Sequence, residues 1–293
     1  MTGEKMRIRF DAVKYIDENG NIFDKLCLVD VLNQQPDKNL IEDLLSLQNP
    51  DEGFPWKLLG KIPSSIVMTS RVLELLFKIG FDKNSFEVKK GINFLVNKQR
   101  LDGGWSENPE LAPYIPKEHG WISTEHSMTW ATGEVVIALI KVGYPNHASI
   151  KNAVSFLKRT QKDDGGWNSH VGKNYPYGTD LASMDSIVRA LLLSGEDRTS
   201  DIMKRVVSTL LKYRNKWESP VDASAVLDIF LNLGYDPKNE YVKELVQTLI
   251  RTQKPNGSWS PIETLATDPT QTLYCLQQLK KCGVQIYLAS PSQ

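Results

Sequence analysis

The segment "FLKRTQKDDGGWNSH", residues 156–170, decides the fold because related forms of it occur three times in the chain. A near copy, "FLVNKQRLDGGWSEN", occupies residues 94–108, and a looser copy, "TLIRTQKPNGSWSPI", occupies residues 248–262. Each copy ends an apolar segment with Gln, a short loop, Gly and Trp. Tryptophans separated by 49, 62, 50 and 42 residues mark these and two further loops: Trp56, Trp105, Trp167, Trp217 and Trp259. Self-similarity at this period indicates a repeat architecture.

The segments between these loops have the period of helices. Val88, Ile92 and Leu95 fall at i, i+4 and i+7, which places them on one helix face. A second, nearly apolar helix in each repeat ends in Gly, where helices commonly stop with a left-handed residue. These glycines are Gly80, Gly143, Gly195, Gly234 and Gly283. Each repeat therefore holds one apolar helix and one more polar helix.

The expected fold is all-α, a single α/α toroid of about five to six helix pairs. The apolar helix of each pair would line the inside and the polar helix the outside. We expect this domain to span residues 36–293, with residues 1–35 as an N-terminal extension of uncertain structure. An open superhelix is the alternative arrangement of the same pairs.

Composition narrows the functional class. The chain has 293 residues and 41% hydrophobic content, typical of a globular protein. Lys plus Arg and Asp plus Glu both total 35, so the basic surplus of a nucleic-acid binder is missing. The longest apolar run, residues 135–140, is too short to span a bilayer, and the N-terminus lacks a signal-peptide core. Three cysteines without metal-ligand spacing favour a cytoplasmic protein, with peripheral membrane contact left open.

The Gln-loop-Trp segments are predicted to be structural. Gln99, Gln161 and Gln253 each stand four residues before a Gly and six before a Trp. A Gln side chain at a helix end can bond carbonyls without partners or amides of the next repeat. The Trp can then pack its large face on the neighbouring helix. These segments would tie one repeat to the next.

The stretch "KGINFLVNKQRLDGGW" resembles the QW motif of squalene–hopene and oxidosqualene cyclases. Over residues 40–285, the repeats resemble the wider prenyltransferase and squalene-cyclase superfamily. The resemblance implies either protonation of an alkene by a DxDD aspartic acid or prenyl transfer at a zinc site. This sequence lacks DxDD. In the most similar stretch, residues 178–191, Asp180 and Asp185 are too far apart to form that motif. Ser224 and Gln271 stand where the zinc ligands Cys and His are expected, so no metal or other cofactor is predicted.

Aligning the apolar helices on their terminal Gly reveals a polar strip. The strip contains Glu74, Arg189, Asp228 and Gln277, and one turn earlier Arg71, Glu134 and Tyr274, on helices that are otherwise apolar. We predict that it faces the central cavity; ion pairing near helix ends is the alternative. The predicted catalytic residues are Glu134, Asp185 and Arg189. Asp185 precedes Arg189 by four residues, so the two can pair. Apolar surroundings without a nearby cation would favour protonated Glu134, as a general acid needs.

Five further residues are predicted to bind substrate: Trp130, Tyr177, Asp222, Ser224 and Tyr274. Trp130 lies one turn before Glu134, and Tyr177 lies in a loop expected at the cavity rim. Asp222 follows Ser219–Pro220, which has the form of an N-cap and first helical residue, so helix capping is its alternative role. Asp180 is likewise expected to cap a helix.

The predicted function is that of a terpene cyclase-like enzyme, an isomerase or lyase, acting on an apolar and isoprenoid substrate in the cavity. This expectation rests on the resemblance, and the fold alone does not imply function. A non-catalytic toroid that binds a lipid or a partner is the first alternative. An enzyme of unrelated chemistry on the same scaffold, such as a polysaccharide lyase, is the second.

Overall fold

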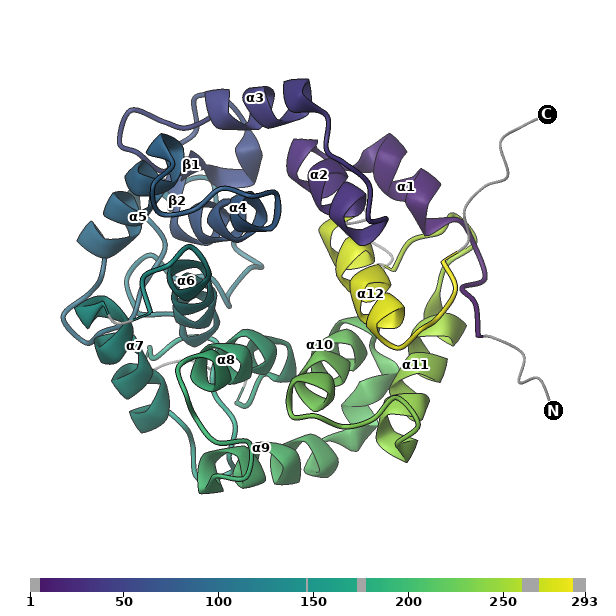
Figure 1. Ribbon diagram of the computed structural model, residues 1–293. Coiled ribbons are helices and arrows are strands. Elements are labelled where there is room, and N and C mark those ends of the chain that lie inside the picture. The colour runs from purple at the N-terminus through teal and green to yellow at the C-terminus, as the bar shows by residue number, and fades with distance from the viewer. Residues whose placement is uncertain (1–5, 146, 173–177, 260–268, 287–293) are drawn as a thin grey trace, which may run out of the picture. The chain divides into compact units, whose positions relative to one another are not determined.

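The computed structural model describes residues 6–145, 147–172, 178–259 and 269–286. Apart from a hairpin of two short strands, its regular elements are helices (Figure 1). The chain divides into two compact units. Unit 1 comprises residues 1–40 and 213–293, and unit 2 comprises residues 41–212. We describe each unit by itself.

Unit 2 contains three of the apolar helices with a terminal Gly, which we call the Gly-terminated helices. These are α4 (Ile66–Lys78), α6 (Thr129–Lys141) and α8 (Leu181–Leu193). The more amphipathic helices of this unit are α5 (Phe86–Asn97), α7 (Ala148–Arg159), α9 (Asp201–Lys212) and, from residue 41 on, α3 (Lys38–Ser46). The antiparallel hairpin of β1 (Phe54–Pro55) and β2 (Ser64–Ser65) precedes α4. Helix α6 packs against both α4 and α8.

Unit 1 is built in the same way from both ends of the chain. Its Gly-terminated helices are α10 (Pro220–Asn232) and α12 (Pro269–Lys281), and α11 (Glu240–Thr252) lies between them in sequence. The N-terminal segment, which the sequence left without a structure, forms α1 (Ala12–Asn19) and α2 (Ile22–Val31). Both pack against α12 (Figure 1).

The predicted glycine stops are confirmed. All five glycines have a positive φ, between 73° and 104°, a conformation that glycine adopts without the strain of a side chain. At the other helix ends, Asp180 caps α8 by accepting from the backbone of Ala182 at 3.1 Å, as expected. Ser219 is the N-cap of α10 and Pro220 its first residue, also as expected. Ser219 fills this position without a side-chain hydrogen bond to the described first turn.

The Gln-loop-Trp segments have the predicted structural role. Gln99 donates both to Gly103 O, at 2.8 Å in its own loop, and to Ser149 O, at 2.8 Å in the first turn of α7. Gln161 bonds Gly165 O at 2.9 Å and Ile202 O of α9 at 3.2 Å in the same way. The tryptophans at the ends of these loops are fully buried. Each donates its indole N–H to the last turn of the preceding helix, at 2.7 Å for Trp105 and 2.8 Å for Trp167.

The third Gln-loop-Trp segment joins the two ends of the chain within unit 1. Gln253 accepts from Arg9 N at 2.8 Å and Phe10 N at 2.9 Å, and donates to Phe10 O at 2.9 Å. These residues directly precede α1. The N-terminal helices therefore occupy the place of the repeat that follows the last Trp, and α1 and α2 form a further helix pair.

Candidate functional site

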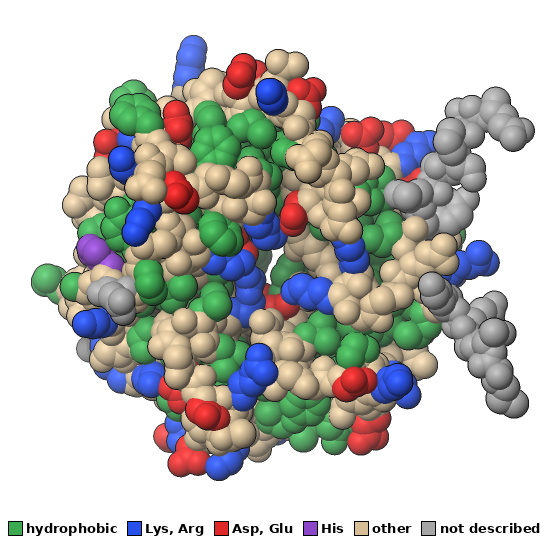
Figure 2. Space-filling model, in the orientation of Figure 1, with side chains coloured by type: hydrophobic (Ala, Val, Ile, Leu, Met, Phe, Trp, Pro, Cys, Tyr) green, Lys and Arg blue, Asp and Glu red, His purple; other side chains and the backbone are tan. Residues whose placement is uncertain are grey.

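Within unit 2, the polar strip occupies the partly open side of α4, α6 and α8. The helix side chains around it are mostly buried, whereas Arg71, Glu74, Glu134, Asp185 and Arg189 are only partly buried. In the orientation of Figure 2, Lys and Arg side chains gather beside these three helices. We call the charged residues of the three helices the charged strip: Arg71, Glu74, Lys78, Glu134, Lys141, Asp185 and Arg189.

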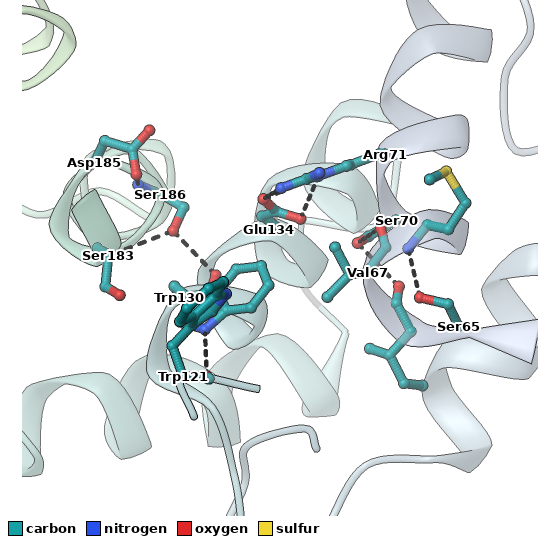
Figure 3. Close-up of polar contacts among 12 residues, drawn as sticks. Ser65, Val67, Ser70, Arg71, Trp121, Trp130, Glu134, Ser183, Asp185 and Ser186 are labelled. Atoms are coloured by element: carbon teal, nitrogen blue, oxygen red, sulfur yellow. Dashed lines mark hydrogen bonds and ion pairs between the residues drawn. The ribbon is translucent and has the colours of Figure 1, made fainter. Parts of the chain in front are cut away.

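The predicted catalytic residue Glu134 forms an ion pair with Arg71. The guanidinium donates three hydrogen bonds to the carboxylate, the shortest at 2.7 Å from Arg71 Nη2 to Glu134 Oε1 (Figure 3). The general-acid interpretation required surroundings without a cation, and this condition is not met. A fork of N–H groups suits an ionised carboxylate, which accepts a proton or stabilises positive charge.

Glu74 connects three helices through one carboxylate oxygen. Its Oε1 accepts from Lys141 Nζ at 2.6 Å and from Arg189 Nη2 at 3.0 Å. Burial raises the pKa of Glu74, but Arg189, Lys141 and Lys78 outweigh it and lower the pKa to about 2. The predicted catalytic Arg189 is thereby fixed against α4, while Asp185, one turn earlier on α8, bonds the backbone N–H of Ser186 at 2.6 Å.

Replacing Glu74 by Gln should destabilise the protein by about 3 kcal/mol at neutral pH, because two partly buried cations lose their carboxylate. The lowered pKa means that this contribution is complete above the usual carboxyl range and is lost as pH falls toward 2. Urea unfolding should therefore show a difference between wild type and Glu74→Gln that shrinks from about pH 5 to about pH 2. The exposed Glu125→Gln serves as control. A difference that does not change with pH would refute this assignment.

An apolar patch adjoins the charged strip near the N-termini of α4 and α6. The buried side chains of Val67, Met128 and Ala131 form its base, and the half-buried Ile122 and Trp130 pack against them. These five residues are the apolar patch. Trp121 is 41% exposed and adjoins the patch through its backbone, because Trp130 Nε1 donates to Trp121 O at 3.4 Å (Figure 3). The ring of Trp121 lies against His119, with the two ring centroids 4.4 Å apart. Trp130 was predicted from the sequence, whereas Ile122 and Trp121 were not.

Close packing of α6 on α8 fixes the position of the apolar patch relative to the charged strip. A Cβ atom at Gly133 would lie 2.7 Å from the carbonyl oxygen of Ser186, so this contact requires glycine. Ser186 Oγ also donates to Trp130 O at 3.0 Å (Figure 3). Glu134, directly after Gly133, therefore lies beside the α8 segment that carries Asp185.

The sequence analysis missed Glu107, a fully buried carboxyl at the N-terminus of α4. It accepts from Ser65 Oγ at 2.7 Å, Ile66 N at 2.8 Å and Val67 N at 3.3 Å. Burial raises the pKa of Glu107, against the effect of these hydrogen bonds. The contacts hold the helix that carries Arg71 and Glu74. The available signal was an acid two residues after the Trp of a repeated loop, a position that faces the next helix.

The remaining predicted residues lie in unit 1 or outside the described chain. Ser224 is buried, donates to Val221 O at 2.9 Å and accepts from Gln271 at 3.1 Å. Asp222 lies in the first turn of α10, and both it and Tyr274 of α12 are half-buried. Tyr177 falls outside the described residues. That the strip residues of all five Gly-terminated helices share one cavity stays a prediction.

The position that resembles a prenyltransferase zinc site contains a network of neutral groups. Gln271 Nε2 donates to Ser224 Oγ at 3.1 Å and to Cys275 Sγ at 3.2 Å. Burial raises the pKa of the Cys275 thiol to about 12, so this group is not a thiolate at neutral pH. Among the residues that the structure describes, no group of three His, Cys, Asp or Glu is arranged to hold a metal ion.

No helix in the described part of the chain is both long and apolar enough to cross a membrane.

Comparison with known proteins agrees with the repeats and the fold. Residues 122–219 match the squalene–hopene cyclase C-terminal domain. Lanosterol synthase of Candida albicans is 36% identical over 96 residues, which are 32% of this chain and 13% of that protein. Squalene–hopene cyclase of Alicyclobacillus acidocaldarius is 27% identical over 195 residues, 58% of this chain and 30% of that protein. The resemblance to the squalene-cyclase superfamily is confirmed. The matched region spans less than a third of each of these relatives.

Solved structures show the same fold over most of the chain. The type II terpene cyclase MstE from Scytonema has a TM-score of 0.63 and 15% identity, covering 89% of this chain and 88% of MstE. A complex of a variant of that enzyme contains geranylgeranyl dihydroxybenzoate as substrate. An α-amylase from Clostridium perfringens has a TM-score of 0.62 at 11% identity, covering 89% of this chain and 84% of the amylase. The predicted all-α fold is therefore confirmed.

Proposed function

We propose that this chain is a terpene cyclase-like enzyme that binds an isoprenoid chain against α4, α6 and α8. The observation that carries the proposal is the apolar patch adjoining carboxylates on the same helices. Trp130 and Ile122 offer apolar area to a hydrocarbon chain, and indole faces attract positive charge. Local sequence similarity to two triterpene cyclases and the substrate of the related MstE variant support an isoprenoid ligand.

Glu134 and Asp185 are the proposed carboxylates of the reaction, with Arg71 and Arg189 as positioning residues. Arg71 holds the Glu134 carboxylate in a fixed orientation beside Trp130. Addition of a proton to an alkene of the substrate forms a cationic carbon, which a fixed carboxylate next to an aromatic face stabilises. The same carboxylate accepts the proton that the cation loses as the final double bond forms, so that the substrate gains and loses one proton. The other proposed binding residues are Tyr177, Asp222, Ser224 and Tyr274, carried over from the sequence prediction.

The proposal is tested by incubating the purified chain with geranylgeranyl and farnesyl substrates and analysing the products by gas chromatography and mass spectrometry. A cyclase yields a product of the same elemental composition as the substrate, or as its hydrate, with fewer double bonds. Heat-denatured protein is the control. Absence of both binding and turnover for every isoprenoid probe would contradict the proposal.

A non-catalytic isoprenoid-binding protein is the second candidate. The pairing of Glu134 with Arg71 favours it, because the carboxyl that was predicted as the acid is arranged as an ion pair. Calorimetric binding of the isoprenoid without any product would support this candidate over the enzyme. The fold shared with an α-amylase also keeps an enzyme of unrelated chemistry among the alternatives.

A further inference from the structure

A pocket of about 590 Å³ lies in unit 2, beyond the C-terminal ends of α4 and α6. Three segments form its wall: the loop that follows α4, the start of α5 and the loop between α6 and α7. The lining includes Lys83, Asn84, Lys89, Tyr144, Pro145 and His147. Pockets of this volume accommodate small organic molecules.

The pocket is separate from the apolar patch. The patch lies near the N-termini of α4 and α6, whereas the pocket lies beyond Gly80 and Gly143, the glycines that end these two helices. Helix α6 has 13 residues and therefore separates the two places by about 20 Å along its axis. A ligand of the pocket is thus a second ligand, distinct from the isoprenoid of the proposed function.

The wall of the pocket is held together by contacts between its loops. Lys83 N donates to Val142 O at 3.0 Å, which joins the loop after α4 to the end of α6. A Cβ atom at Gly143 would lie 3.2 Å from Lys83 Cδ, so the stem of this lysine packs over the glycine. The rings of Tyr144 and His147 meet edge to face, with their centroids 6.1 Å apart. The pocket is therefore preformed.

The lining contains two cations and no carboxylate. Lys83 and Lys89 are exposed, and neither forms an ion pair with a carboxylate in the part of the chain that the structure describes. The Asp82 carboxylate instead accepts from Asn84 N at 2.8 Å and Asn84 Nδ2 at 3.0 Å. These bonds, chiefly that of the backbone N–H, lower the pKa of Asp82, with a lesser effect of Lys83. Both ammonium groups can therefore bind an anion in the pocket.

A third donor comes from His147. Its Nδ1 accepts from Ser149 N at 3.2 Å, so the neutral ring carries its proton on Nε2, which can donate to a ligand. The lining contains no arginine, the residue that suits the planar, two-point recognition of a carboxylate. Ammonium groups act as point charges and are common partners of phosphate. Tyr144 and Pro145 add apolar surface beside these donors.

We propose that this pocket binds an organic phosphate, with the phosphate group at Lys83, Lys89 and His147. The organic part of the ligand lies against Tyr144 and Pro145. The site goes beyond the proposed function and does not depend on it. A soluble phosphate ester and the head group of a phospholipid present the same chemistry, and the test below distinguishes them.

The test compares phenyl phosphate with phenol by titration calorimetry on the full chain. The two probes share the ring, but only the ester carries the phosphate. The ester should bind at least about tenfold more tightly than phenol. Because this preference is electrostatic, it should decrease as salt is raised from about 0.05 M to about 0.5 M. Equal affinity for the two probes would overturn a phosphate site.

Lys83→Gln and Lys89→Gln should each weaken binding of phenyl phosphate at least about fivefold, because each removes one of the two cations. The matched control is Lys98→Gln at the opposite end of α5, outside the pocket, which should change the affinity by less than about twofold. All three lysines are exposed, so the variants should fold as wild type does, and circular dichroism checks this. Equal losses in the control and the pocket variants would overturn the assignment.

Co-sedimentation with vesicles identifies the source of the phosphate. The comparison is between phosphatidylcholine vesicles with and without phosphatidic acid. Binding that requires phosphatidic acid and is lost in Lys83→Gln and Lys89→Gln would support a phospholipid head group. Binding of phenyl phosphate without binding to either vesicle would support a soluble ester. Failure of both phenyl phosphate and the phosphatidic acid vesicles to bind would overturn the site and leave the proposed function untouched.

Discussion

Trp167→Ala is expected to lower the free energy of unfolding by about 3–5 kcal/mol, the usual cost of truncating a buried Trp. Trp167 is fully buried, and its indole N–H donates to Leu157 O at 2.8 Å at the end of α7. The substitution therefore removes packing area and leaves a carbonyl without its partner. Urea or thermal unfolding measures the loss.

The matched control is Trp121→Ala. Trp121 is 41% exposed, so its truncation should change the unfolding free energy by less than about 1 kcal/mol. Trp121→Ala should nevertheless weaken isoprenoid binding, because Trp121 is exposed and directly precedes Ile122 of the apolar patch. Unchanged stability in Trp167→Ala, combined with lost ligand binding, would reverse the roles assigned to the two tryptophans.

Glu134→Gln is expected to lower turnover at least about 100-fold, the lower end of what a positioned proton-transfer group contributes. The amide keeps the shape of the side chain but cannot accept a proton or stabilise a cation as a carboxylate does. Ligand affinity should stay within about tenfold of wild type, a difference of about 1.4 kcal/mol. Single-turnover kinetics and calorimetry measure the two quantities separately.

Breaking the Arg71–Glu134 pair also has a structural cost, so a matched ion pair serves as the control. Glu196→Gln breaks the pair with Lys158, whose closest atoms lie 2.5 Å apart outside the strip, and should leave turnover unchanged. Full turnover in Glu134→Gln would remove Glu134 from the reaction and favour the non-catalytic candidate.

Local chemistry explains which parts of the fold the sequence could predict. A helix stop at Gly143 or Gly195 depends on a glycine and the residues within one turn of it. The Gln161 segment could also be predicted, because its Gln, Gly and Trp lie within seven residues and the same pattern repeats in the chain. The pairing of Gln253 with Phe10 joins residues 243 positions apart and could not be predicted from a repeat pattern.

The site was harder to predict because its pairs join different helices. The sequence pattern placed Arg71, Glu74, Glu134 and Arg189 on one strip, and the structure confirms that these residues are its partly open polar positions. Whether Glu134 has a cation as neighbour depends on the packing of α6 on α4, across 63 residues of sequence. Gly133 lets α6 pack closely against Ser186 of α8. This contact involves two helices and could not be predicted from the sequence of either one.

A crystal structure of the chain with geranylgeranoic acid tests the central claim most directly. The account predicts density for the hydrocarbon chain against Trp130 and Ile122, running along α6 past Glu134. Density for the hydrocarbon chain elsewhere on the molecule would contradict it.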